Sequence, residues 1–195
     1  MTEATLDQLQ QLLAERPPVS LEDLGGNPAA VLVLIYLKNN EYCLHFQKRP
    51  KNLRRHQGEV CFPGGTPEDI DADLLATALR EAHEEEDILP QDVTLLGRMD
   101  DVPTRTGFTL QVYVGTIPYP YTFKPNAQEV EEIMEVPLKV LCDPSSWREE
   151  IRWVDGNPVT RYSYTYGTHI IYGATATIVN HFLEIIGEVQ ENGRN

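Results

Sequence analysis

Apolar positions recur with two different spacings along this chain, and the spacing changes from block to block. Between Thr5 and Glu15 they recur every three or four residues, which predicts an amphipathic helix ended by Pro17-Pro18. The same spacing predicts a helix from Ala174 to Glu188, and a short helix at Pro137–Leu141. Short β-branched or alternating runs predict strands at 31–36, 42–47, 58–63, 93–99, 108–117, 132–136, 151–154, 159–166 and 168–172. Asn39-Asn40 lies between the first two runs and is typical of a hairpin turn.

Strands and helices interleave along one chain of 195 residues. This order predicts an α/β domain around a mixed sheet, and the length suits one domain with a full core. We expect residues 1–195 to form a single domain. Residues 1–28 would be a helix and an approach segment, and residues 190–195 a frayed tail.

A helix that ends in clustered carboxylates follows a pair of glycines. The stretch GGTPEDIDADLLATALREAHEEEDI opens with Gly64-Gly65, which we expect to form a turn, and ends at Ile88. Glu81, Glu84 and Glu85 stand at i, i+3 and i+4, so a helix places them on one face within about one turn. Like charges this close destabilise a helix, and negative charge at a helix C-terminus opposes its dipole. A solvated acidic helix end explains this poorly, whereas a hard cation between the carboxylates explains it well. The pattern therefore predicts a Mg²⁺ or Mn²⁺ site.

The charge balance supports the same interpretation. The net charge is 16 − 30 = −14, and residues 64–90 hold nine acidic residues against one basic residue, Arg80. A nucleic-acid or anionic-membrane partner is therefore not expected. The odd number of cysteines, three, without a CxxC pair predicts neither a zinc site nor a disulfide framework, and favours a reducing, cytoplasmic setting. No apolar run is long enough to span a membrane, and the polar start MTEATLDQLQ does not resemble a secretion signal. The sequence leaves open whether two copies form a homodimer.

The central stretch resembles the Nudix box, G-x5-E-x7-R-E-U-x-E-E-x-G-U, where U is an aliphatic residue. The second half matches as Arg80, Glu81, Ala82, His83, Glu84, Glu85, Glu86, Asp87, Ile88. Two positions depart. The first acidic position falls on Ala72, and an insertion of one residue after Gly65 would make Asp71 its counterpart. The last glycine is replaced by Asp87, so the exit from the helix need not use a residue at positive φ.

The residues before the box resemble the coenzyme A pyrophosphatase branch, L-L-T-x-R-S-x-x-L-R-x-H-x-G-x-V-x-F-P-G-G. The positions in register are Arg49, Leu53, Arg54, His56, Gly58, Val60 and Phe62 to Gly65. Pro50 replaces the usual serine, and His45-Phe46-Gln47-Lys48 departs from the apolar and Thr positions. Thr106-Gly107-Phe108 and Tyr172-Gly173-Ala174-Thr175-Ala176 are also similar to this branch. The resemblance implies a Nudix-type α/β/α sandwich.

The resemblance also implies roles for particular residues. Glu81 and Glu85 would be metal ligands, and Gly65 would let the backbone approach the metal or the diphosphate without a Cβ in the way. Glu84 would be a further ligand, bind through water, or help to deprotonate the attacking water. Arg80 would orient a glutamate rather than touch substrate. A later carboxylate, Glu129, Glu131 or Glu132, would join the site as base or ligand.

Outside the box, the sequence leaves several alternatives open. The basic residues Arg49, Lys51, Arg54 and Arg55 form either a solvated loop or, as we favour, a clamp for a ribose phosphate or diphosphate. His56 contacts a phosphate or hydrogen-bonds its own loop, and His83 faces outward on the helix. The apolar stripe of the helix, which we expect to be buried, is Leu75, Ala78, Leu79 and Ala82.

These observations predict a metal-dependent hydrolase of a nucleoside diphosphate linked to another group. The branch resemblance implies coenzyme A or acyl-CoA as substrate, cleaved to 3′,5′-ADP and (acyl-)4′-phosphopantetheine. The alternatives are hydrolysis of another dinucleotide, such as ADP-ribose or NADH, and a Nudix-like domain that binds nucleotides without catalysis. The intact REUxEE core argues against the second alternative.

Overall fold

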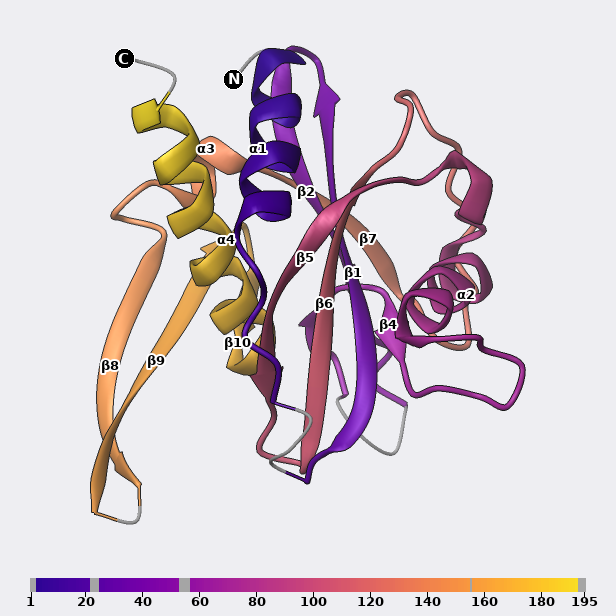
Figure 1. The fold of residues 1–195 in the computed structure, drawn as a ribbon. Coiled ribbons are helices and arrows are strands. Elements are labelled where there is room, and N and C mark those ends of the chain that lie inside the picture. Colours follow the sequence, from indigo (N-terminus) through magenta and orange to yellow (C-terminus); the bar gives the residue numbers. More distant parts are fainter. Residues whose placement is uncertain (1–2, 22–24, 53–56, 155, 193–195) are drawn as a thin grey trace.

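The computed structural model describes residues 3–21, 25–52, 57–154 and 156–192 of the chain (Figure 1). In chain order the elements are α1 Glu3–Glu15, β1 Asn27–Lys38, β2 Glu41–Lys48, β3 Val60–Cys61, β4 Gly64–Gly65, α2 Leu74–Glu86, the 3₁₀ turn η2 Pro90–Asp92, β5 Thr94–Pro103, β6 Phe108–Thr116, β7 Glu132–Pro137, α3 Leu138–Leu141, β8 Trp147–Val154, β9 Asn157–Tyr166, β10 His169–Tyr172 and α4 Gly173–Asn192. The predicted mixed α/β fold is confirmed. None of the helices in these ranges has the length and apolar character needed to cross a membrane.

A mixed sheet of seven strands forms the centre of the molecule. Its main order is β3-β2-β1-β6-β5, with β4 added beside β1 and β7 beside β2. β1 runs parallel to β6 and antiparallel to β2 and β4. The β1–β2 turn is the predicted hairpin, because Asn39 and Asn40 have φ of 51° and 64°, the two positive values that a two-residue type I′ turn requires.

β1 is buried on both faces and divides the interior into two cores. Val33 and Ile35 face the core under α1 and α4, whereas Leu32 and Leu34 face the core under α2. Figure 1 shows α1 and α4 on one side of the sheet and α2 on the other, which is the predicted α/β/α arrangement. Helix α2 is therefore held against the centre of the sheet, beside β1 and β4.

A second, smaller sheet lies on the α4 side. It has the antiparallel order β10-β9-β8, and Tyr164 of β9 is buried in the same core as the face of α4. The β8–β9 hairpin extends beyond α4 and away from the main sheet (Figure 1). The hairpin is thus anchored at one end and exposed at the other.

Candidate active site

The N-terminus of α2 is fixed by a side-chain cap. Asp73 has extended backbone angles, and its carboxylate accepts a hydrogen bond of 2.8 Å from the backbone N–H of Ala76. Ala78 and Ala82 are fully buried against the sheet, and their small side chains let the helix approach β1 closely. The acidic C-terminal half of α2 is thereby placed over the glycine pair of β4.

Gly64 and Gly65 form a short strand, so the predicted turn is wrong. They pair antiparallel with Val31 and Ala30 of β1, because the chain after Pro63 continues alongside the central strand instead of reversing. The expectation of a close approach at Gly65 is met: a Cβ there would collide with the carboxylate of Glu81. Gly64 has φ of +155°, which L side chains rarely adopt, and a Cβ there would collide with the carbonyl of Ala30. The two glycines bring backbone within reach of the carboxylates of α2.

Glu85 is the most deeply buried carboxylate of the predicted metal set, with a side chain 1% exposed. One oxygen accepts a hydrogen bond of 3.1 Å from the N–H of Gly64. The other lies 3.6 Å from a guanidinium nitrogen of Arg49. The pKa of Glu85 is raised to about 8, above all by burial and also by the charge of Glu81. Hydrogen bonds from Gln47 and Gly64 act against this rise but do not cancel it.

Glu81 lies between Gly65 and the guanidinium of Arg80, at 3.0 Å from the latter. Burial raises the pKa of the Glu81 carboxyl, and the charges of Glu84 and Glu129 add to the rise, whereas Arg80 lowers it. Two neighbouring carboxyls thus both resist ionisation in the absence of a cation. A cation bound between them would favour the ionised form of both carboxyls.

Arg80 contacts carboxylates and backbone, as predicted for an orienting residue. Its side chain is 11% exposed. It donates to Asp71 at 3.0 Å, to Glu84 at 2.9 Å and to the carbonyl of Thr66 at 3.0 Å. Asp71, one residue before Ala72, is thus a carboxylate that pairs with Arg80. The hydrogen bonds that Asp71 accepts from Arg80, and less strongly those from Glu68 N–H and the Thr77 hydroxyl, lower its pKa to about 2.

Glu84 faces solvent, with a side chain 53% exposed, and it is held by Arg80. It does not lie with Glu81 and Glu85 in a closed cage: in the part of the chain that the structure describes, no three Asp, Glu, His or Cys side chains converge as a metal-binding group. Its exposure and orientation suit a carboxylate that accepts a proton or binds through water.

The C-terminal end of α2 uses a residue at positive φ although the glycine of the box is replaced. Asp87 has φ of 59° and caps the helix in the left-handed conformation. Asp tolerates this region better than most residues, and Lys124 pairs with its carboxylate at 2.6 Å. The expected buried stripe of α2 needs correction: Ala78 and Ala82 are buried, but Leu75 and Leu79 are only half-buried, while Glu85 and Glu86 are buried. His83 is exposed, as predicted.

Sequence reasoning missed a buried polar network beside the site. Glu86 and His45 have fully buried side chains and form a direct pair between α2 and β2. His45 Nδ1 lies 3.1 Å from the hydroxyl of Tyr36, and that hydroxyl donates to Glu135 at 3.0 Å. The available signal was the presence of His45 and Gln47 at alternate positions of β2, on the face opposite the apolar residues Tyr42, Leu44 and Phe46. Their partners, 41 residues away in the case of His45 and Glu86, cannot be read from that pattern.

The structure distinguishes the three later carboxylates. Glu131 pairs with Lys48 at 2.7 Å, and Glu132 lies 3.5 Å from His169. Glu129 instead lies close enough to Glu81 for its negative charge to raise the pKa of that carboxyl. The loop that carries it is tied to α2 by a hydrogen bond of 2.8 Å from Asn126 N–H to the carbonyl of Glu85. Glu129 is therefore the one placed beside the carboxylates of α2.

The predicted basic clamp is described in part. Arg49 lies at the site beside Glu85, as given above, and is 26% exposed. Lys51 is exposed. The other three residues of the prediction, Arg54, Arg55 and His56, lie outside the described residues.

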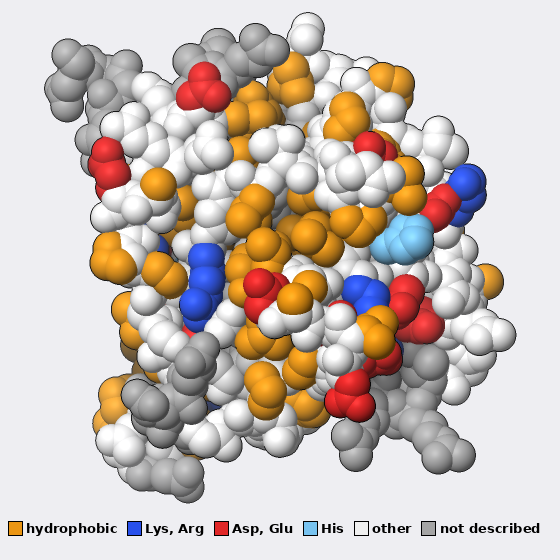
Figure 2. All heavy atoms as spheres, turned by 45° about the vertical axis from the view of Figure 1, so that its right-hand side comes forward, with side chains coloured by type: hydrophobic (Ala, Val, Ile, Leu, Met, Phe, Trp, Pro, Cys, Tyr) orange, Lys and Arg blue, Asp and Glu red, His pale blue; other side chains and the backbone are white. Residues whose placement is uncertain are grey.

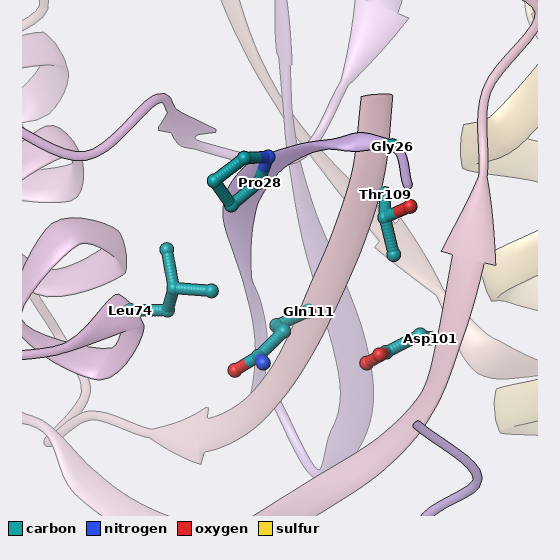
Figure 3. A pocket seen from close by; sticks show the side chains of 6 residues that line it. All are labelled: Gly26, Pro28, Leu74, Asp101, Thr109 and Gln111. Atoms are coloured by element: carbon teal, nitrogen blue, oxygen red, sulfur yellow. The ribbon is translucent and has the colours of Figure 1, made fainter. Parts of the chain in front are cut away.

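A pocket of about 220 Å³ lies beside the start of α2 (Figure 3). In the sheet it lies on the β6 side of β1, whereas the glycine pair of β4 lies on the β2 side. It is lined by Gly26, Pro28, Leu74, Asp101, Thr109 and Gln111. Gln111 is opposite Ala30 in the sheet, and Ala30 is opposite Gly65. Two strand spacings, about 10 Å, therefore separate Gln111 from Gly65. Figure 2 shows this side of the molecule, with acidic side chains gathered around basic ones next to apolar side chains.

The residues present fit a divalent cation. Glu81 and Glu85 supply two carboxylates of raised pKa next to a backbone without Cβ atoms. Mg²⁺ is commonly held by one or two carboxylates while waters and substrate phosphates complete its coordination, so an open pair suits it better than a closed cage.

Comparison with known proteins supports the resemblance to the Nudix box. A family profile described as "NUDIX domain" matches residues 26–156. A protein of Photorhabdus laumondii subsp. laumondii, named "Uncharacterized Nudix hydrolase NudL", is 36% identical over 174 residues, which cover 89% of this chain and 92% of that protein.

Solved structures show the same fold. A MutT/nudix family protein from Enterococcus faecalis superposes with a TM-score of 0.55 at 12% identity, covering 96% of this chain and 75% of that one. A C. elegans Ap4A hydrolase gives a TM-score of 0.50 at 16% identity, covering 57% and 80%. The chain therefore belongs to the Nudix family of hydrolases, enzymes that cleave diphosphate bonds of nucleoside diphosphate derivatives and generally use divalent metal cations.

Proposed function

We propose that this chain hydrolyses the diphosphate bond of coenzyme A or acyl-CoA to 3′,5′-ADP and (acyl-)4′-phosphopantetheine. In this proposal Mg²⁺ or Mn²⁺ binds at Glu81 and Glu85, next to the backbone of Gly65. A cation bound there would neutralise charge on the diphosphate and lower the pKa of a coordinated water.

The observation that carries the proposal is the position of Arg49 beside Glu85. In a chain of net charge −14, a guanidinium lies 3.6 Å from the most buried carboxylate of the site, with part of its surface exposed. An anionic group bound near Glu85 would therefore meet Arg49. The rest of the basic segment, Arg54, Arg55 and His56, would extend this clamp toward the 3′-phosphate of the substrate.

The other site residues have roles that follow from their contacts. Arg80 would hold Glu81 and Glu84 in place, and Asp71 would hold Arg80. Glu84 and Glu129 would be the candidates to accept the proton of the attacking water, since both act on Glu81 electrostatically. Water oxygen would bond to one phosphorus as the bridging P–O bond breaks, and the released phosphate would take the bridging oxygen.

The pocket at Gln111 would receive the part of the substrate on the far side of the diphosphate from the basic segment. Arg49 lies on the β2 side of the glycine pair, whereas Gln111 lies on the β6 side. Leu74 and Pro28 would contact the dimethyl group of the pantetheine arm, and the amide of Gln111 would face its amides (Figure 3).

The first experiment tests the metal set. Glu85→Gln should lower kcat/KM by at least about 100-fold, because it removes a charged ligand at a buried position. Glu188→Gln, an exposed change on α4 across the sheet, is the matched control and should leave turnover unaffected. Near wild-type activity of Glu85→Gln would disprove the metal assignment, as would full activity in EDTA.

The second experiment tests the substrate. Coenzyme A, 3′-dephospho-CoA and ADP-ribose should be compared, with products identified by mass spectrometry in H₂¹⁸O. Loss of the 3′-phosphate should lower kcat/KM by about 10- to 100-fold, the contribution of hydrogen bonds to a charged group. Arg49→Ala should lower kcat/KM for CoA and 3′-dephospho-CoA alike, because Arg49 lies beside Glu85 and would meet the diphosphate that both compounds share. Equal turnover of all three compounds would refute the coenzyme A assignment and leave a less selective dinucleotide hydrolase.

A further inference from the structure

The β8–β9 hairpin exposes large apolar side chains far from the site. Trp153 is 74% exposed and Ile151 is 66% exposed. Both lie on the face of β8 that begins with Trp147, which is packed against the core near α4. The strand face that carries Trp147 therefore continues past the part that is covered, and Figure 1 shows the hairpin extending beyond α4. Isolated apolar residues on a surface are ordinary, but a tryptophan and an isoleucine along one strand face suggest a partner.

The outer edge of β8 is also unpaired. In the described chain β8 pairs with β9 alone, and every residue from Arg148 to Val154 is exposed. An edge strand of this length presents a row of backbone donors and acceptors that can pair with another strand. The hairpin thus offers both a backbone edge and an apolar face.

Charge indicates which partner fits. Residues 147–166 contain three arginines and three acidic residues, so their net charge is 3 − 3 = 0, whereas the whole chain carries −14. Two copies of such an acidic protein repel each other over most of their surfaces. The hairpin is a neutral region through which two copies can approach.

We propose that two copies of this chain associate through antiparallel pairing of their β8 edges, centred on Ile151. A two-fold axis perpendicular to the sheet keeps each strand face on the same side, so only residues of the same face stand opposite each other. Centred on Ile151, this register places Ile151 opposite itself and Glu150 opposite Arg152 of the other copy, twice. Glu150 and Arg152 already hydrogen-bond at 2.7 Å within each strand, so four charges of alternating sign would meet.

The neighbouring registers place like charges together. Centring on Glu149 or Glu150 opposes a glutamate with itself, and centring on Arg152 opposes two arginines. Directly opposed like charges are destabilising in antiparallel pairs. The sequence of β8 thus favours the register at Ile151 over the three others in the middle of the strand.

Charge reversal tests this arrangement. Wild-type protein should shift from monomer to dimer between roughly 1 and 500 µM in light scattering after size exclusion, since a small interface gives micromolar affinity. Glu150→Arg and Arg152→Glu should each weaken dimerisation at least about tenfold, and the double variant should restore it, because it re-creates opposite charges in both copies. Glu188→Arg makes the same change in net charge as Glu150→Arg on α4 and should not weaken the dimer. Hydrolysis should be unchanged in all four variants.

Cross-linking tests the register independently. Opposed Cβ atoms in an antiparallel pair lie about 4.5–5.5 Å apart, close enough for a disulfide after a small movement. In a Cys142→Ser background, which removes the exposed native thiol, Ile151→Cys should give a covalent dimer on mild oxidation. Ile170→Cys, on the opposite edge strand of the same sheet and 56% exposed, should not. A wild-type protein that stays monomeric throughout, a dimer that the double reversal fails to restore, or equal cross-linking of both cysteine variants would overturn the proposal.

Discussion

The site depends first on the absence of a side chain at Gly65. A Cβ there would occupy the space taken by the carboxylate of Glu81, so Gly65→Ala should displace one of the two proposed ligands. We expect kcat/KM to fall by about 10- to 100-fold, as when a ligand is misplaced, with little change in secondary structure by circular dichroism. Gly187→Ala is the matched control, because a Cβ at that helical position meets nothing within 4 Å. It should stabilise the protein by up to about 1 kcal/mol and keep its activity. An active Gly65→Ala enzyme would contradict the proposed ligand position.

Asp71 gives a second prediction at the residue scale, concerning pH. Its folded pKa of about 2 lies below the value near 3.9 of an unfolded aspartate. A lowered pKa means that the ionised carboxylate stabilises the fold above pH 4, and that this stabilisation is lost as the pH falls from about 4 toward 2. Asp71→Asn should therefore be less stable than wild type in urea unfolding at pH 7, and the difference should shrink between pH 4 and pH 3.

The control for this prediction is Asp69→Asn, an exposed aspartate two residues away with the same change in charge. Its stability should follow that of the wild type at each pH. If the gap between Asp71→Asn and wild type stayed constant from pH 7 to pH 3, the pairing with Arg80 would not be its source.

At the scale of elements, the pair between His45 and Glu86 joins α2 to β2 just after the proposed ligand Glu85. Both side chains are fully buried, so removing one leaves the other buried without its partner. His45→Leu should cost about 3–5 kcal/mol in the free energy of unfolding, measured with urea. His45→Leu combined with Glu86→Leu should recover part of that loss, because no charge is then left unpaired.

His83→Leu is the control, since it changes an exposed histidine of α2 and should stay within about 0.5 kcal/mol of wild type. An additive double variant would show that the two side chains do not interact.

The elements also show what the sequence could and could not predict. The spacing of Glu81, Glu84 and Glu85 fixed their common helix, because i, i+3 and i+4 are neighbours on any α-helix. It could not tell that Glu84 turns to Arg80 and solvent while Glu85 is buried, since that depends on where β4 lies. The replacement of the last glycine of the box left the conformation at the helix end open, because Asp87 can also occupy the left-handed region that glycine prefers.

Contacts between segments distant in the sequence could not be predicted from local patterns. The choice of Glu129 over Glu131 follows from Lys48, which pairs with Glu131 from another strand. Such pairings are set by the register of β2 with β7, in which Lys48 stands opposite Glu132. Local patterns predict strands well, but they do not predict which strand lies beside which.

At the scale of the whole molecule, a chain of net charge −14 has a buried carboxyl, Glu85, and a half-buried one, Glu81, both of raised pKa, one helical turn apart on α2. A cation that binds the folded state there stabilises it by RT ln(1 + [L]/Kd), about 2.7 kcal/mol at 100 times Kd. MgCl₂ should therefore raise the urea midpoint more than NaCl of equal ionic strength, because NaCl only screens the overall repulsion. In the double variant Glu81→Gln/Glu85→Gln, MgCl₂ should raise the urea midpoint no more than NaCl does, because only the screening of charge remains. It should also be no less stable than wild type without metal, since two charges that resist burial are removed. Equal effects of the two salts on wild type would place the cation elsewhere, and would show that the acidity of the chain as a whole, rather than this pair of carboxylates, sets its response to magnesium.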